Sequence, residues 1–122
     1  MGCILVAEDD FKTRILITII LQRAGYHTDQ AEDGRQALDV LDSDAAVDLM
    51  ISDIMMPGVD GLQLLEQAQK DYPHIPVILL SGLGKTDWMQ KALDKGAVSC
   101  LNKPFTQQQL VKVVGDVLRA GV

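Results

Sequence analysis

Residues 4–10 read ILVAEDD, an apolar run that ends abruptly in three acidic side chains. Two further apolar runs have the same form: LMISD at residues 49–53 and VILLS at residues 77–81. Continuous apolar runs of this length are typical of strands that helices cover on both faces. The three runs therefore predict the centre of a parallel sheet, with polar side chains just beyond its strand ends.

Helices are predicted between these strands, over residues 12–24, 35–42, 60–70 and 86–95, with a last helix after Thr106. Gly25 is a typical helix end. Asp60 and Thr106 are each followed three residues later by Gln, which is the pattern of a capping box. Either Thr86 or Asp87 can cap the fourth helix.

Two more polar stretches, residues 26–31 and 98–101, predict strands at the edges of the sheet. Strand and helix then alternate five times, which implies parallel strands joined by right-handed crossovers. With the apolar strands in the middle, the expected strand order is 2-1-3-4-5. The fold class is a flavodoxin-like, doubly wound (βα)5 sheet. We expect residues 1–122 to form one domain, with nothing left over for an output domain.

The bulk composition limits the possible functions. The chain has 122 residues and a formal net charge of −6, which disfavours direct binding to nucleic acid or to anionic membranes. No apolar run approaches the ~20 residues that span a bilayer, and a signal peptide pattern is absent. Cys3 and Cys100 are expected to be buried free thiols, which indicates a reducing cytoplasmic location.

The predicted strand order brings acids together. In such sheets, ligands bind beyond the carboxyl ends of the strands where the strand order reverses, here between the first and third strands. Glu8, Asp9, Asp10 and Asp53 follow those two ends. Carboxylates ~4 Å apart repel by a few kcal/mol at a protein surface, and Mg²⁺ offsets this repulsion while keeping positions open for other oxygens.

Two other strand ends supply complementary groups. Ser81 ends the fourth strand with a hydroxyl, and Lys103 follows the fifth with an ammonium. A transferred phosphoryl group carries charge on three oxygens, which Mg²⁺, Lys103 and Ser81 can each contact. Asp53 is then the candidate nucleophile, and it would form an acyl phosphate.

Each of these residues also has a purely structural interpretation. The acids after the first strand can cap the first helix, and Asp10 is the main candidate for this cap. Asp53 can be a loop acid, Ser81 a turn residue and Lys103 a solvated lysine. The hypothesis of a phosphoryl site depends on their coincidence at the ends of neighbouring strands.

Five motifs lie along the chain at characteristic spacings: residues 4–10 (ILVAEDD), 53–61 (DIMMPGVDG), 81–82 (SG), 96–97 (GA) and 103–105 (KPF). On these motifs the chain resembles, over nearly its whole length, the receiver domain of two-component response regulators.

The resemblance implies a role for each matching residue. Asp53 would be the phosphorylation site, and Asp9, the Met55 carbonyl and, through water, Glu8 would hold Mg²⁺. Ser81 and Lys103 would contact the phosphoryl group, and the Lys103–Pro104 bond would be cis. The domain would be a phosphoacceptor switch rather than an enzyme.

The resemblance also implies partners. The phosphoryl donor would be a sensor histidine kinase or a phosphotransfer protein. An output domain or a second copy would bind the face formed by the fourth helix, fifth strand and fifth helix. Cys100 departs from the family, which usually has Tyr or Phe there, so we expect an altered response on this face. Trp88 belongs either to the core or to this face.

Four alternatives are weaker. Residues 81–86 (SGLGKT) resemble a phosphate-binding loop, but Leu79 stands where that motif needs Gly. A flavin carrier would need a loop rich in Ser, Thr and Gly where the three acids lie. An aspartyl phosphatase would place its nucleophile after the first strand. A degenerate receiver that only binds partners is disfavoured by Asp53, Lys103 and the acidic pair. His27 and His74 lie at no C-terminal strand end and are expected on the surface.

Overall fold

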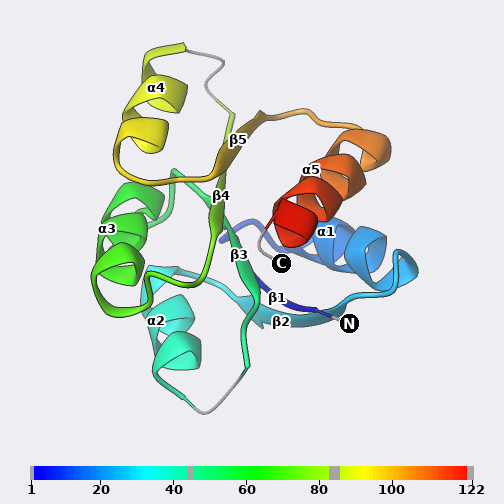
Figure 1. The fold of residues 1–122 in the computed structure, drawn as a ribbon, viewed down its shortest axis with the longest axis horizontal. Helices are drawn as coiled ribbons and strands as arrows, with labels where there is room; N and C mark the ends of the chain where they lie inside the picture. The colour runs from blue at the N-terminus through cyan, green and yellow to red at the C-terminus, as the bar shows by residue number, and fades with distance from the viewer. Residues whose placement is uncertain (1, 44–45, 83–85, 121–122) are drawn as a thin grey trace.

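The computed structural model describes residues 2–43, 46–82 and 86–120, in which five strands alternate with five helices (Figure 1). The strands are β1 (Cys3–Ala7), β2 (His27–Ala31), β3 (Leu49–Asp53), β4 (Val77–Ser81) and β5 (Ser99–Asn102). The helices are α1 (Phe11–Arg23), α2 (Gly34–Asp42), α3 (Gly61–Asp71), α4 (Thr86–Asp94) and α5 (Gln107–Ala120). The predicted elements are all present, and their ends differ from the sequence-based expectation by one residue or so.

The sheet is parallel throughout and has the order β2-β1-β3-β4-β5, which confirms the predicted flavodoxin-like fold. β1, β3 and β4 are almost wholly buried, whereas the edge strands β2 and β5 are partly exposed. The continuous apolar runs therefore lie in the centre of the sheet, as expected for strands covered on both faces.

Helices cover both faces of the sheet (Figure 1). On one face, α1 and α5 pack through residues such as Ile17 and Leu110 against Val6 and Ile51. On the other face, α2, α3 and α4 pack against the alternate strand residues, such as Leu5 and Met50. The two cores thus cover both faces, and because all five strands are parallel, their carboxyl ends lie along one edge of the sheet.

The helix ends bear out the capping predictions that can be examined. Asp60 caps α3 in a capping box with Gln63, and Thr106 and Gln109 exchange the equivalent hydrogen bonds at α5. Gly25, with a φ of 98°, follows the end of α1. α4 begins at Thr86. Residues 83–85, half of the loop that resembles a phosphate-binding motif, lie outside the described residues, as do the side chains of the predicted caps Thr86 and Asp87.

The cysteines differ slightly from expectation. Both thiols are free, but Cys3 and Cys100 are only partly buried, because each lies on a strand near the margin of a core. His27 and His74 are exposed, as predicted. Among the described residues, no helix has the length and apolarity needed to cross a bilayer.

Candidate functional site

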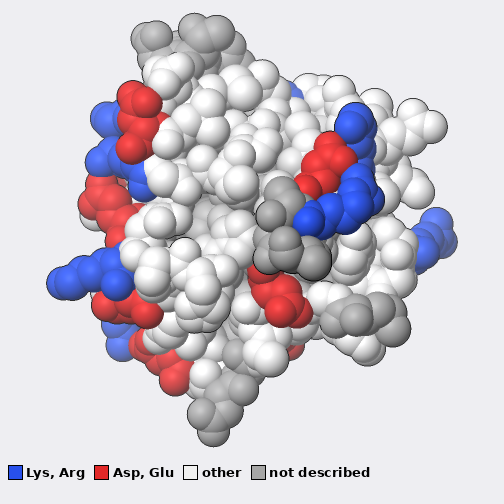
Figure 2. Space-filling view, viewed as in Figure 1, with Lys and Arg blue, Asp and Glu red and all other residues white. Residues whose placement is uncertain are grey.

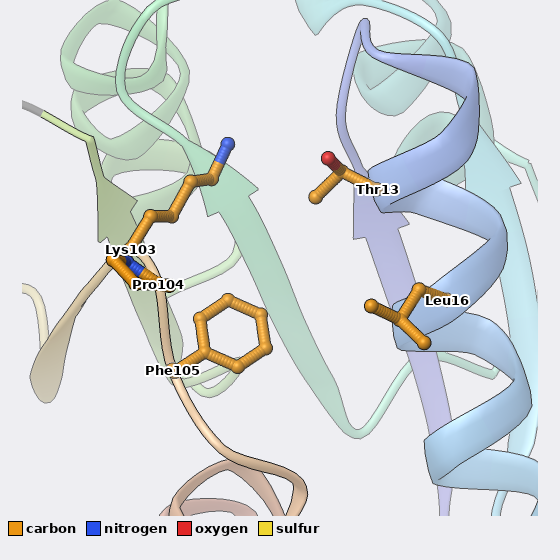
Figure 3. A pocket seen from close by; sticks show the side chains of 5 residues that line it. All are labelled: Thr13, Leu16, Lys103, Pro104 and Phe105. Carbon is orange, nitrogen blue, oxygen red and sulfur yellow. The ribbon is translucent and has the colours of Figure 1, made fainter.

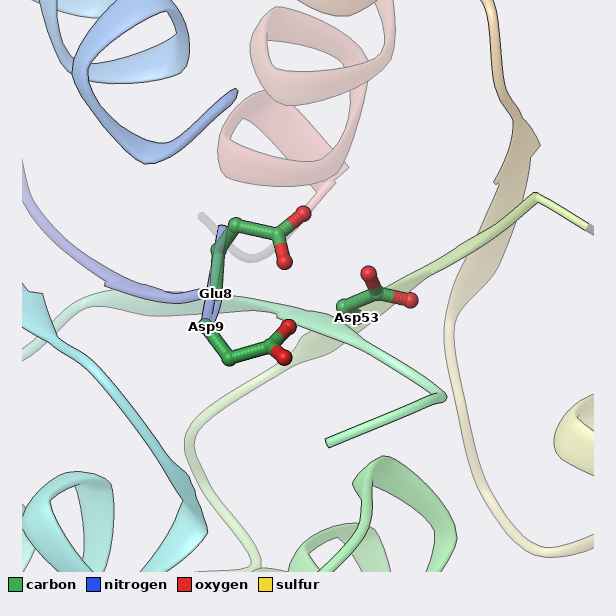
Figure 4. Close-up of side chains that lie close together, drawn as sticks. All are labelled: Glu8, Asp9 and Asp53. Carbon is green, nitrogen blue, oxygen red and sulfur yellow. The ribbon is translucent and has the colours of Figure 1, made fainter. Parts of the chain in front are cut away.

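Three carboxylates meet beyond the ends of β1 and β3. Ala7 pairs with Ser52, so Glu8 and Asp53 follow as neighbours on adjacent strands. One carboxylate oxygen from each of Glu8, Asp9 and Asp53 lies within 4.8 Å of the other two (Figure 4). Glu8 and Asp53 are buried, whereas Asp9 is exposed. The structure thus brings together three of the four acids that the strand order predicted.

Asp10 stands apart from this cluster. Its carboxylate accepts hydrogen bonds from the backbone amide and the hydroxyl of Thr13, at 2.9 and 2.6 Å. These hydrogen bonds lower the pKa of Asp10, as is usual for a helix cap. The structural interpretation of Asp10 as the N-cap of α1 is therefore correct.

Lys103 faces the cluster from the segment after β5. Its Nζ lies 2.5 Å from Oε1 of Glu8 and 2.5 Å from Oδ2 of Asp53. Its backbone amide donates to the carbonyl of Ser81 at 2.7 Å, which fixes the segment against the end of β4. The Lys103–Pro104 peptide bond is cis, as expected. One ammonium is thus shared between two buried carboxylates.

The site is short of positive charge. Burial raises the pKa of Glu8 to about 7, although the Lys103 hydrogen bond opposes this and the Asp53 charge adds to it. Burial acts to lower the pKa of Lys103, but hydrogen bonds with Asp53 and Glu8 outweigh it and raise the pKa. The lysine therefore stays cationic, yet it offsets only part of the charge of three acids. A divalent cation suits this oxygen-rich cluster.

Backbone groups orient the two buried acids. The amide of Asp10 donates to Oε2 of Glu8 at 3.2 Å, and the amide of Met55 donates to Oδ1 of Asp53 at 3.2 Å. Each carboxylate therefore uses one oxygen for a backbone amide and the other for Lys103. The Met55 side chain is largely exposed, so the residue serves this site through its backbone.

Gly61 permits the start of α3 to pack against the end of β3. Its amide donates to the carbonyl of Ile54 at 2.8 Å. A Cβ atom at this position would lie 2.3 Å from the backbone oxygen of Asp53, which is far inside van der Waals contact. Only glycine fits this approach without a shift of the strand end.

Ser81 is buried at the end of β4. Asp53 pairs with Leu80, so Ser81 follows on the strand that adjoins Asp53. The hydroxyl-bearing residue therefore lies on the same edge of the sheet as the acids and Lys103, as the strand order predicted.

Sequence reasoning missed Arg14, which is buried in the first turns of α1. It donates from Nη1 to the backbone carbonyl of Glu8 at 2.9 Å and from Nε to Oε1 of Gln30 at 3.1 Å. The helical spacing held the signal, because Arg14 lies three and seven residues before the core residues Ile17 and Leu21.

The fold and this cluster define a class of α/β domains with an acidic pocket at the carboxyl edge of the sheet. The profile of the response regulator receiver domain matches residues 4–115, so the chain belongs to this family. Members of this family are the receiver domains of two-component phosphorelay signalling.

Individual relatives agree with the family assignment. The chain is 34% identical over 115 residues to sporulation initiation phosphotransferase F of Bacillus subtilis, which covers 94% of this chain and 92% of that protein. The receiver domain of Francisella response regulator 1452 superposes over 100% of both chains with a TM-score of 0.93 and 32% identity.

Other relatives are longer. The chain is 35% identical to the phosphate regulon transcriptional regulatory protein PhoB of Pseudomonas aeruginosa, over 95% of this chain but only 51% of that protein. It likewise spans about a quarter to a half of several other regulators that it matches.

Proposed function

We propose that the chain accepts a phosphoryl group on Asp53 from a phosphohistidine of a sensor kinase or phosphotransfer protein, and that the resulting acyl phosphate switches partner binding. The observation that carries this proposal is the meeting of Glu8, Asp9, Asp53 and Lys103 at one edge of the sheet. The likeness to a protein named as a phosphotransferase supports it.

The reaction is proposed to depend on Mg²⁺. Asp9, Asp53 and the backbone carbonyl of Met55 would hold the ion, with Glu8 assisting through water. The donor set fits, because these are hard oxygen ligands and Lys103 alone leaves the three acids under-neutralised. When bound, Mg²⁺ would neutralise charge on the transferred phosphoryl oxygens.

The protein's own residues would perform the transfer. A carboxylate oxygen of Asp53 attacks phosphorus, the P–N bond to the donor imidazole breaks, and the imidazole leaves with the electron pair of that bond. Lys103, already hydrogen-bonded to Asp53, would donate to one phosphoryl oxygen, and the Ser81 hydroxyl would donate to another. The chain would thus be a self-catalysing phosphoacceptor rather than an enzyme with a separate substrate.

A groove beside Lys103 supports the approach of a protein donor. Its volume is about 340 Å³, and its lining comprises Thr13, Leu16, Lys103, Pro104 and Phe105. Leu16 from α1 and Phe105 from the segment after β5 face each other across it (Figure 3). Apolar side chains of a donor would pack here while its phosphohistidine reached Asp53.

The face formed by α4, β5 and α5 is the proposed site for an output domain or a second copy. Uncharged side chains fill much of the surface between α3 and α5, with charged residues towards its margins (Figure 2). Val98, Ser99, Val113 and Val117 line a groove of about 280 Å³ there, together with Asp116.

Cys100 and Trp88 lie near this face, and both pack against the core. The Cys100 thiol donates to the carbonyl of Met89 in α4 at 3.8 Å. We propose that phosphorylation changes this face in a different way from the change in a receiver that has an aromatic residue at position 100. The reason is that Cys100 has no ring that could rotate into the core.

The test is intact-mass measurement after incubation with a small phosphodonor. A single phosphoryl adduct should form with Mg²⁺ and should be absent with a chelator and in Asp53→Asn. The matched control Asp39→Asn removes an exposed carboxylate on α2 and should keep the adduct. A stable fold that takes no phosphoryl group would favour the alternative of a degenerate receiver acting only as an interaction module.

A further inference from the structure

Arg14 joins three segments around the acidic cluster. Its side chain is 7% exposed, and it contacts the end of β1 through the carbonyl of Glu8 and β2 through Gln30. Its Nη2 also lies 3.9 Å from Oε1 of Glu32, in the turn after β2. A buried guanidinium is tolerated only where acceptors meet its fork of donors. These acceptors therefore fix the position of Arg14, and Arg14 fixes theirs.

The backbone at Glu8 is held on both sides. Its amide donates to the carbonyl of Ala31 at 3.1 Å, and its carbonyl accepts from Arg14 at 2.9 Å. The peptide that links Glu8 to Asp9 is therefore anchored by the guanidinium. The positions of both carboxylates depend on that peptide.

The ring of Phe11 covers the guanidinium, with its centroid 5.4 Å from the Arg14 carbon. Phe11 is itself 65% exposed and lies one turn before Arg14 in α1. A cation at this distance from a ring face is attracted to it, which favours the observed position of the guanidinium. The hydrogen bond from Arg14 to the Glu8 carbonyl is buried.

We propose that Arg14 is a positioning residue for the acidic cluster, which orients Glu8 and Asp9 towards a divalent cation through the Glu8 carbonyl. This inference rests on the proposed function, because it assumes that the cluster binds Mg²⁺. It adds a role to a residue that contacts no carboxylate of the cluster directly.

The direction in which Mg²⁺ affinity changes when Arg14 is replaced distinguishes a positioning role from a purely electrostatic one. Arg14 is a cation close to a proposed cation site, so its charge alone opposes Mg²⁺ binding. If Arg14 acted only through its charge, removing it would strengthen binding. If it positions the loop, removing it weakens binding, and outer-shell partners of metal ligands commonly change affinity by roughly 10–100-fold.

The test is calorimetric titration of the unphosphorylated full chain with Mg²⁺. Arg14→Met should raise the dissociation constant roughly tenfold. Arg14→Lys should also raise it, because it keeps the charge but loses the fork of donors. Arg119→Met is the matched control, since it removes the same charge from an exposed position on α5 and should leave the constant unchanged. Unchanged or tighter binding in Arg14→Met would overturn the inference.

A second variant covers the case in which Arg14→Met does not fold. Gln30 is exposed on an edge strand and accepts from Nε of Arg14, so Gln30→Met removes the acceptor without disturbing a core. It should weaken Mg²⁺ binding by a few-fold, and no change would count against the positioning role.

The amide NMR signals of Glu8 and Asp10 in metal-free Arg14→Lys give a readout that needs neither ion nor phosphate. Shifts at these two amides are expected, and unshifted signals would contradict the inference. A wild-type chain that binds Mg²⁺ but takes no phosphoryl group would defeat the proposed function and leave this result standing.

Discussion

The Nζ atom of Lys103 lies 2.5 Å from Oδ2 of Asp53, although 50 residues separate them in the sequence. The same atom lies 2.5 Å from Oε1 of Glu8. The contact connects the segment after β5 with the ends of β1 and β3, across the intervening strand β4. Lys103 therefore stabilises an arrangement of acids that would otherwise repel each other.

Replacing Lys103 with Met should destabilise the metal-free protein, because two buried carboxylates lose their cation. Breaking a buried pair costs about 3–5 kcal/mol, and the partial exposure of Lys103 reduces the expected loss to about 1–3 kcal/mol. Urea unfolding in chelator measures the loss. Added Mg²⁺ should restore part of the lost unfolding free energy.

Lys112→Met, which breaks an exposed pair with Asp116, is the control and should change the unfolding free energy by less than about 1 kcal/mol. Equal effects of the two substitutions would contradict the shared role of Lys103.

The pH dependence of stability should reveal the buried Glu8. Its pKa is raised from 4.5 to about 7 in the fold, so the unfolded chain releases this proton first as pH rises. The contribution of Glu8 to stability is thus fully present below about pH 4.5 and is lost as pH rises through about 7. In chelator, the melting temperature of wild type relative to Glu8→Gln should fall between pH 5 and pH 7.5. A difference that stays flat or rises over this range would exclude the raised pKa.

Gly61→Ala should disturb the site through the backbone. The added Cβ would lie 2.3 Å from the Asp53 oxygen and 2.7 Å from the Ile54 Cα, neither of which can move freely. We expect a loss of about 1–3 kcal/mol in unfolding free energy and slower formation of the phosphoryl adduct. Gly115→Ala in α5 meets only the flexible end of Arg119 and should be neutral or stabilising by up to about 1 kcal/mol. Equal stability of the two variants would refute the close approach.

Cys100→Tyr should leave phosphorylation intact but change its consequence. The thiol lies on β5 and donates to the carbonyl of Met89 in α4. Hydrogen exchange in α4, β5 and α5, measured with and without the phosphodonor, should therefore differ between wild type and this variant. Identical exchange patterns would show that the side chain at position 100 does not shape the response.

Much of the fold was predictable because burial and polarity are local signals. The apolar runs ending at Ala7, Asp53 and Ser81 identified the central strands, and the polar strands then had to lie at the edges. The strand order in turn predicts that the acids and Lys103 lie on one edge of the sheet. Asp60 and Thr106 were recognisable as caps because their partners lie only three residues away.

The remaining features depend on tertiary contacts. Asp9 and Asp10 are adjacent residues of the same type, so the sequence does not say which of them caps the helix. Only the hydrogen bonds that the Asp10 carboxylate accepts from Thr13 identify it as the cap. Arg14 is not readily recognisable from sequence because arginine on a helix is usually solvated, whereas its burial depends on the backbone carbonyl of Glu8, just after β1, and the side-chain oxygen of Gln30 in β2. Such partners cannot be inferred from spacing along the chain.

The most direct test of the account is to locate the phosphoryl group itself. The phosphorylated chain is reduced with borohydride, which converts an acyl phosphate of aspartate into homoserine, and its peptides are then mapped by mass spectrometry. We predict homoserine at position 53 alone, formed only when Mg²⁺ and phosphodonor were both present. Modification at His27, His74 or Ser81 with Asp53 unchanged would contradict the claim that the acids of β1 and β3 and Lys103 form a phosphoacceptor site.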